Sequence, residues 1–171
     1  MIDCSSWLAQ RNILESHCGQ PLADGTYYRR FAKANGAAAA DVFSSIARQP
    51  DTTQATKFIL QFTDWSCFGN IPIPDTLRPL RDASFKQTTA LDLLGLAMSM
   101  QEFALLSACC TYIIDEGLSA YVYASNPSLT AYLWEGEFLE IWSADAAAVE
   151  LATQSLRRSG VDFVIQMDDS R

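Results

Sequence analysis

Residues 88–114 read TTALDLLGLAMSMQEFALLSACCTYII, and this stretch decides how the rest of the 171-residue chain can be arranged. Only Asp92, Gln101 and Glu102 are strongly polar within it, and it contains no proline. It is long enough for about seven helical turns, and a helix that is apolar on nearly every side belongs in a protein core or a bilayer. Because Asp92 and Glu102 leave no run of eighteen uncharged residues, the pattern predicts a buried central helix over about 88–115.

The segments on either side of this predicted helix differ in character. Upstream, amphipathic or alanine-rich stretches with capping residues predict helices at 7–18, 26–35, 37–49 and 55–65. Downstream, β-branched and aromatic runs predict strands at 119–125, 128–134, 137–143 and 161–167, with a helix at 144–159 that Ser143 caps. Runs of helices followed by runs of strands are typical of an α+β fold.

We therefore expect a single domain over 1–171 with two lobes. The helical lobe, about 1–116, would hold four to five helices around the long central helix. The β-rich lobe, about 117–171, would be a small antiparallel sheet with one covering helix. The proline-rich segment 66–83 fits either a packed strap or a mobile lid.

A turn at Glu135-Gly136 joins two of the predicted strands. If these two residues alone form the turn, Leu133 pairs with Phe138, and large apolar side chains fall on both faces of the hairpin. One face would pack on the core, and the other would be partly open or covered by the next helix.

The chain is acidic, with 20 Asp and Glu residues, 12 Lys and Arg residues and a net charge of −8. Ten of the acids and three of the arginines lie from Asp115 onward, which leaves −7 in the last third. Such a surface repels phosphate backbones, so we expect no nucleic-acid partner, and it favours a protein partner that is basic on its contact face. The N-terminus lacks the basic and apolar regions of a secretory signal, which predicts a cytoplasmic protein with no membrane association.

Catalytic signatures are weak in this sequence. The candidates are Asp92 and Glu102, which could act as an acid and base if an apolar setting raised their pKa values, and the single histidine, His17, paired with a cysteine. Ion pairs with arginines, or contact with water at the edge of the core, are the better account of the two carboxylates, since ten residues of helix would hold them about 15 Å apart. The five cysteines are expected to be reduced and mostly buried.

Motifs for cofactors are absent from the sequence. There is no C-x-x-C, no second histidine and no glycine-rich phosphate loop, so we expect neither a metal nor a nucleotide cofactor.

The densest aromatic and acidic cluster lies in the strand region after the predicted central helix. Aromatic side chains with a charged rim are the residue types that carry binding energy at protein interfaces. The candidate partner-binding residues are Trp134, Glu135, Glu137, Phe138, Glu140 and Trp142. The alternative is that the tryptophans belong to the core and the glutamates line the wet face of a sheet.

Three functional hypotheses follow. The first is a non-enzymatic module that sequesters or inhibits a protein partner, such as a bacterial immunity protein that neutralises a cognate toxin. The second is a small hydrolase or transferase that uses Asp92 and Glu102, or a cysteine with His17. The third is an acidic secretion chaperone or a structural homodimer. The first rests on composition and on the absence of catalytic motifs.

Overall fold

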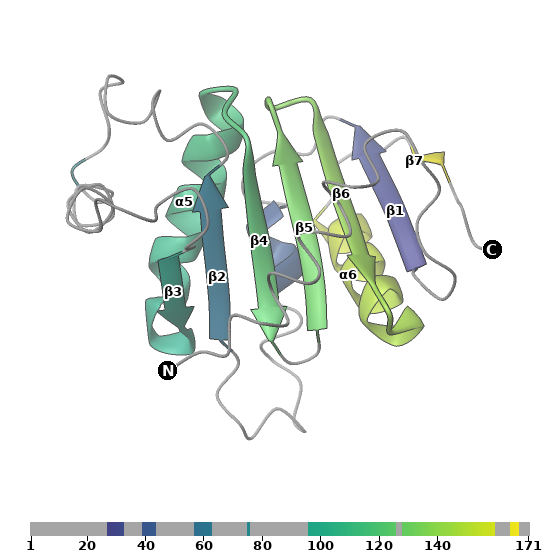
Figure 1. Cartoon of the computed structure of the whole chain (residues 1–171). Helices are drawn as coiled ribbons and strands as arrows, with labels where there is room; N and C mark the ends of the chain where they lie inside the picture. Colours follow the sequence, from purple (N-terminus) through teal and green to yellow (C-terminus); the bar gives the residue numbers. More distant parts are fainter. Residues whose placement is uncertain are drawn as a thin grey trace.

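The computed structural model describes residues 27–32, 39–43, 57–62, 75, 96–125, 128–159 and 165–167. These residues form a seven-stranded antiparallel sheet with helices on one face (Figure 1). The strands are β1 (Tyr27–Ala32), β2 (Lys57–Phe62), β3 (Leu96–Ser99), β4 (Ala120–Ser125), β5 (Ser128–Trp134), β6 (Phe138–Ser143) and β7 (Ile165–Met167). The helices are the 3₁₀ turn η2 (Met100–Glu102), α5 (Phe103–Asp115) and α6 (Ala146–Arg158), with a short helical segment at 39–43.

The expected N-terminal lobe of four to five helices around a long central helix is wrong, although the described part of the predicted helix 37–49, residues 39–43, is helical. Parts of two predicted helices, 26–35 and 55–65, are strands β1 and β2. In β2, Phe58 and Leu60 face the helices while Ile59 faces the opposite side, and all three are buried. A strand that is apolar on both faces has no alternation, so its sequence does not distinguish it from a buried helix.

The expected central helix over about 88–115 is also wrong. In its described part, 96–115, only α5 is α-helical, and Leu96–Ser99 is instead an edge strand that pairs with β2. The helical path begins after Ser99, because the Glu102 carboxylate accepts hydrogen bonds from the backbone N–H and the hydroxyl of Ser99, at 2.9 and 3.0 Å. This pairing satisfies a backbone donor that would otherwise be unpaired at the start of a helix.

The strand order is β3-β2-β4-β5-β6-β1-β7. The predicted strands at 119–125, 128–134 and 137–143 are present as the central meander β4, β5 and β6. Strands from the N-terminal half extend it on both sides, β2 beside β4 and β1 beside β6 (Figure 1). Partners are 58–66 positions apart in the β2–β4 ladder and 106–116 apart in the β1–β6 ladder, so no local sequence pattern predicts these pairings.

The core lies between the sheet and the helices. Both α5 and α6 lie on the far side of the sheet in Figure 1, and they belong to one hydrophobic cluster with the segment 39–43. From the three central strands the cluster receives small and aliphatic side chains: Ala120, Val122, Ala124, Leu129, Ala131, Leu133, Leu139 and Ile141. From the helices it receives Leu106, Cys109, Cys110 and Ile113 of α5, and Ala148, Val149, Ala152 and Leu156 of α6.

The turn between β5 and β6 contains one residue more than the sequence predicted. Glu135 and Gly136 both have positive φ, at 49° and 69°, as expected for the turn. However, Trp134 pairs with Phe138 instead of Glu137, so the register differs by one residue from the predicted one. A slip of one residue exchanges the faces of a strand. Leu133 and Leu139 therefore share the helix-packed face, and the aromatic residues share the other.

Two further observations complete the fold. The predicted helix at 144–159 is confirmed as α6, although its N-cap is Asp145, which accepts from the N–H of Ala147, while Ser143 Oγ accepts from the N–H of Asp145. Among the described residues, no helix has the length and apolarity needed to cross a membrane.

Candidate functional site

The face of the sheet opposite the described helices is built mainly from aromatic side chains. Because side chains alternate between the two faces of a strand, every second residue of β2, β4, β5, β6 and β1 points to this face. We call the set the aromatic face; its members are Tyr28, Arg30, Ile59, Tyr121, Tyr123, Thr130, Tyr132, Trp134, Phe138, Glu140 and Trp142.

Exposure on the aromatic face increases towards the β5–β6 turn. Cross-strand partners on this face form rows that run across the strands. The row farthest from the turn contains Ile59, Tyr123, Thr130, Trp142 and Tyr28. Tyr28 is half-buried, and the other four side chains are buried. In the next row Glu140 is 8% exposed, and Tyr121, Tyr132 and Arg30 are half-buried. At the turn, Trp134 is 37% exposed and Phe138 is half-buried. The face therefore opens to solvent at one end.

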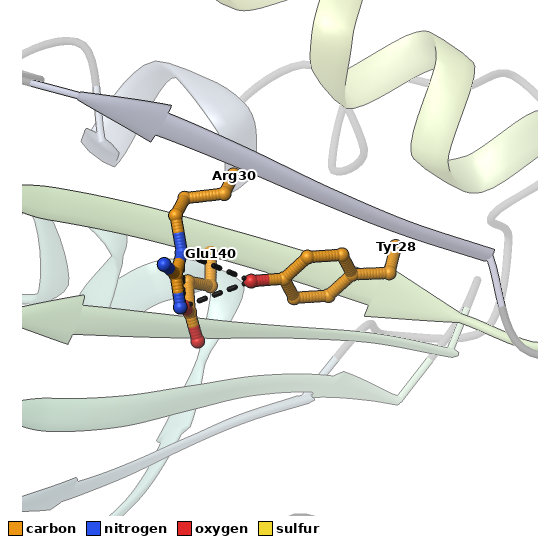
Figure 2. Close-up of polar contacts among 3 residues, drawn as sticks. All are labelled: Tyr28, Arg30 and Glu140. Carbon is orange, nitrogen blue, oxygen red and sulfur yellow. Dashed lines mark hydrogen bonds and ion pairs between the residues drawn. The ribbon is translucent and has the colours of Figure 1, made fainter. Parts of the chain in front are cut away.

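Three side chains form a polar cluster within this aromatic face. Figure 2 shows Tyr28 and Arg30 of β1 converging on Glu140 of β6. The Tyr28 hydroxyl donates to Glu140 Oε1 at 2.9 Å, and Arg30 Nε donates to the same oxygen at 2.6 Å and to the Tyr28 hydroxyl at 3.1 Å. Arg30 Nη2 also forms an ion pair with Glu140 Oε1. The cluster joins β1 to β6 by side chains in addition to the backbone ladder.

The electrostatics of this cluster favour its charged, hydrogen-bonded form. Burial raises the pKa of Tyr28 well above its usual value, and the Glu140 carboxylate raises it further, so the phenol stays protonated and can donate. Burial alone would lower the pKa of Arg30, but Glu140 outweighs that effect and the net shift is upward. A charge pair this poorly exposed is costly to break, because the remaining partner has no counter-ion.

A series of neighbouring aromatic rings connects the interior of the aromatic face to its exposed end. Tyr121 and Tyr132 are stacked with centroids 4.3 Å apart, and Tyr132 lies 6.2 Å from Trp134. Trp134 lies 5.9 Å from Phe138, and the guanidinium of Arg30 lies over the Phe138 ring, 5.4 Å from its centroid. Because each ring contacts the next, Trp134 is held in place even though a third of it is exposed.

The β5–β6 turn is held against the end of α5. A Cβ on Gly136 would lie 2.6 Å from the carbonyl oxygen of Ile114, so only glycine fits at this point. The N–H of Glu135 also donates to Ser119 Oγ at 3.3 Å. We call Trp134–Phe138 the hairpin tip; these contacts fix it to the rest of the fold.

The six predicted partner-binding residues fall into two groups. Trp134, Glu135, Glu137 and Phe138 all belong to the hairpin tip, where the two glutamates are exposed. The other two, Glu140 and Trp142, lie deeper in the aromatic face and are buried. The indole N–H of Trp142 has no acceptor among the described residues. Only the first group is presented to solvent.

The predicted partner-binding residues do not include Tyr28, Arg30, Tyr121 or Tyr132. Tyr121 and Tyr132 carried a usable signal, since aromatic residues recur at every second position in the predicted strands. Arg30 could not be assigned, because its partner Glu140 lies 110 positions away on a strand whose pairing is not local.

The catalytic candidates do not form a site in the described residues. Glu102 is exposed, and the hydrogen bonds from Ser99 lower its pKa, which is the opposite of the raised value that an acid–base role requires. Asp92 and His17 lie outside the described residues, as does the segment 66–83 apart from Asp75.

Cys109 and Cys110 are free and buried, as expected. Burial raises the pKa of both thiols, that of Cys110 to about 12, so they remain protonated and are poor nucleophiles.

Comparisons with protein-family models, with curated proteins and with solved structures gave no significant match. Among the described residues, no group of three or more histidine, cysteine and acidic side chains is placed to hold a metal ion.

Proposed function

We propose that this protein is a non-enzymatic protein-binding module whose hairpin tip docks on a basic surface of another protein. The observation that carries the proposal is Trp134, a large aromatic side chain that is 37% exposed and yet held between Tyr132 and Phe138. Tryptophan is enriched among residues that dominate binding energy, and a fixed ring loses little conformational entropy on binding.

The size of the exposed surface fits an anchor residue. Covering the exposed third of a tryptophan buries on the order of 90 Å², which is worth about 2 kcal/mol. The neighbouring carboxylates of Glu135 and Glu137 are exposed, and they would contribute mainly by steering a basic partner towards the tip. The tip therefore combines an apolar anchor with a charged rim, as protein interfaces do.

Within this class of function, we propose that the protein sequesters or inhibits its partner in the cytoplasm, as an immunity protein does with a cognate toxin. The support for this role is the acidic character of the chain, with a net charge of −8. An acidic inhibitor captures a basic target rapidly and blocks its surface without any chemistry of its own.

Charge reversal at the tip tests this proposal. We expect Glu137→Lys to reduce capture of the partner from a native lysate about tenfold at low salt, because attraction to a basic surface becomes repulsion. The difference should shrink at high salt, where surface charges are screened. Capture is measured by quantitative mass spectrometry of proteins retained by the tagged full-length chain.

Glu150→Lys is the matched control, since Glu150 is an exposed glutamate on α6 and the change in charge is identical. This variant should capture the partner as the wild type does. Equal losses for the two variants would mean that net charge matters and the tip does not. No stoichiometric partner at either salt concentration would contradict the proposed function as a whole.

A further inference from the structure

The chain itself shows how the aromatic face accommodates a cation. Arg30 places its guanidinium over the ring of Phe138 and its Nε and Nη2 atoms on the carboxylate of Glu140. The ring and the carboxylate come from one strand, two residues apart and on the same face. A ring beside a carboxylate is thus an arrangement that this fold already uses to hold an arginine.

The next ring towards solvent, Trp134, is followed in the hairpin tip by two glutamates, and none of the described cations lies over it. Glu135 and Glu137 are exposed, and neither forms an ion pair with any residue that the structure describes. Tryptophan is also the aromatic side chain that binds cations best. The hairpin tip therefore combines the two components used at Phe138, an aromatic ring and carboxylates, within five consecutive residues.

The end of α5 adds further negative charge close to the tip. Asp115 and Glu116 are exposed at its C-terminus, where the helix dipole disfavours acidic groups, and the last turn has no basic residue. Helix α6 differs from α5 in this respect, because its last turn carries Arg157 and Arg158, the basic residues that the helix dipole favours there. The Gly136 contact with Ile114 places the α5 end beside the tip, at the upper end of the sheet in Figure 1.

We infer that the partner inserts an arginine side chain that stacks on Trp134 and pairs with the carboxylates of Glu135 and Glu137. This inference rests on the proposed function and specifies the partner's contact chemistry. Arginine fits better than lysine, because its planar guanidinium can stack on the indole and pair with a carboxylate at the same time. A second copy of this chain is disfavoured as the occupant, since it would bring its own exposed acids to the same place.

The test is a titration of the full-length protein followed by two-dimensional NMR of the tryptophan indole N–H signals. The chain has four tryptophans, and the signal that disappears in Trp134→Phe identifies Trp134. The probes are a hexa-arginine peptide, a hexa-lysine peptide and a neutral glycine-serine hexapeptide. We expect hexa-arginine to shift the Trp134 signal saturably, with an affinity about threefold higher than that of hexa-lysine.

Two variants connect the shift to the proposed contacts. Trp134→Leu keeps an apolar side chain without a π-system, so it should abolish the preference for arginine over lysine. Because this variant has no Trp134 indole, its titration, and a matching titration of the wild type, are followed through the backbone N–H signals of Glu135 and Glu137. Glu135→Gln with Glu137→Gln should weaken both cationic peptides about equally. A Trp134 signal that does not move with hexa-arginine, or moves equally with the neutral peptide, would overturn the inference.

These outcomes are separable from those of the lysate experiment. Capture of a partner that depends on Glu137, without any hexa-arginine effect at Trp134, leaves the proposed function standing and removes the arginine contact. A hexa-arginine effect without any captured partner supports the contact and contradicts the proposed function. If neither the lysate capture nor the hexa-arginine titration gives its expected result, both the proposed function and the arginine contact are contradicted.

Discussion

Gly136→Ala is expected to lower the free energy of unfolding by about 3 kcal/mol. About half of this cost comes from placing an alanine at a positive φ of 69°, and the rest from the Cβ that would meet the Ile114 carbonyl oxygen at 2.6 Å. The colliding atom belongs to the backbone of α5, so it cannot swing aside as a flexible side chain could. The measurement is urea denaturation followed by circular dichroism.

Gly117→Ala is the control for the backbone conformation alone. Gly117 also has a positive φ, 66°, but among the described residues a Cβ there would meet only the Glu135 carbonyl oxygen, at an ordinary 3.7 Å. Its expected cost is about 1 kcal/mol. If Gly136→Ala were no more damaging than Gly117→Ala, the close packing of the turn against α5 would be refuted.

Glu140→Ala is expected to lower the free energy of unfolding by about 2–3 kcal/mol. The substitution leaves the Arg30 guanidinium without its counter-ion and the Tyr28 hydroxyl without the acceptor it uses. The value lies at or below the lower end of the range for buried ion pairs, because the Arg30 side chain keeps 29% of its surface in water. The same urea denaturation measures it.

Two comparisons isolate the ion pair from other effects of the substitution. Glu137→Ala removes an exposed carboxylate on the same hairpin and should change stability by less than about 0.5 kcal/mol. The double variant Arg30→Met with Glu140→Leu should recover most of the loss, because neither charge is then left alone in the aromatic face. A double variant as unstable as Glu140→Ala would show that the cluster acts through something other than its charges.

Local sequence patterns predicted the C-terminal half of the fold better than the N-terminal half. Strands β4, β5 and β6 pair with their neighbours in sequence and are joined by short turns, so turn residues and aromatic runs are sufficient to find them. Strands β1 and β2 depend on partners far away in the chain. Without those partners, TYYRRFA and KFILQF fit a helix as well as a strand.

The prediction of a central helix over about 88–115 was wrong for a different reason. Its apolar residues serve two elements in succession, an edge strand that ends at Ser99 and a helix that begins at Phe103. The signal that separates them was present in the sequence, since Ser99 and Glu102 have the spacing of a capping box. The prediction of one long helix over about 88–115 did not use that spacing.

The candidate site was predicted in composition but not in geometry. Trp134, Phe138, Glu140 and Trp142 share one face of the sheet, but their exposure falls with distance from the turn, so only the residues near the turn reach solvent. One extra residue in the turn decides that Phe138 lies beside Trp134. The additional residue, Glu137, follows a Glu135-Gly136 turn of the expected kind. The sequence alone therefore does not show whether Glu137 belongs to the turn or to β6.

The most direct test of the central claim compares two exposed aromatic residues. Trp134 is 37% exposed at the tip, and Tyr27 is 36% exposed at the opposite end of the β1–β6 ladder, where it pairs with Ser143. The measurement is the amount of partner that Trp134→Ala and Tyr27→Ala each retain from native lysate, relative to the wild type. We expect Trp134→Ala to weaken capture at least tenfold, about 1.4 kcal/mol or more, and Tyr27→Ala to leave it unchanged. Retention by Trp134→Ala equal to that of the wild type would contradict the account.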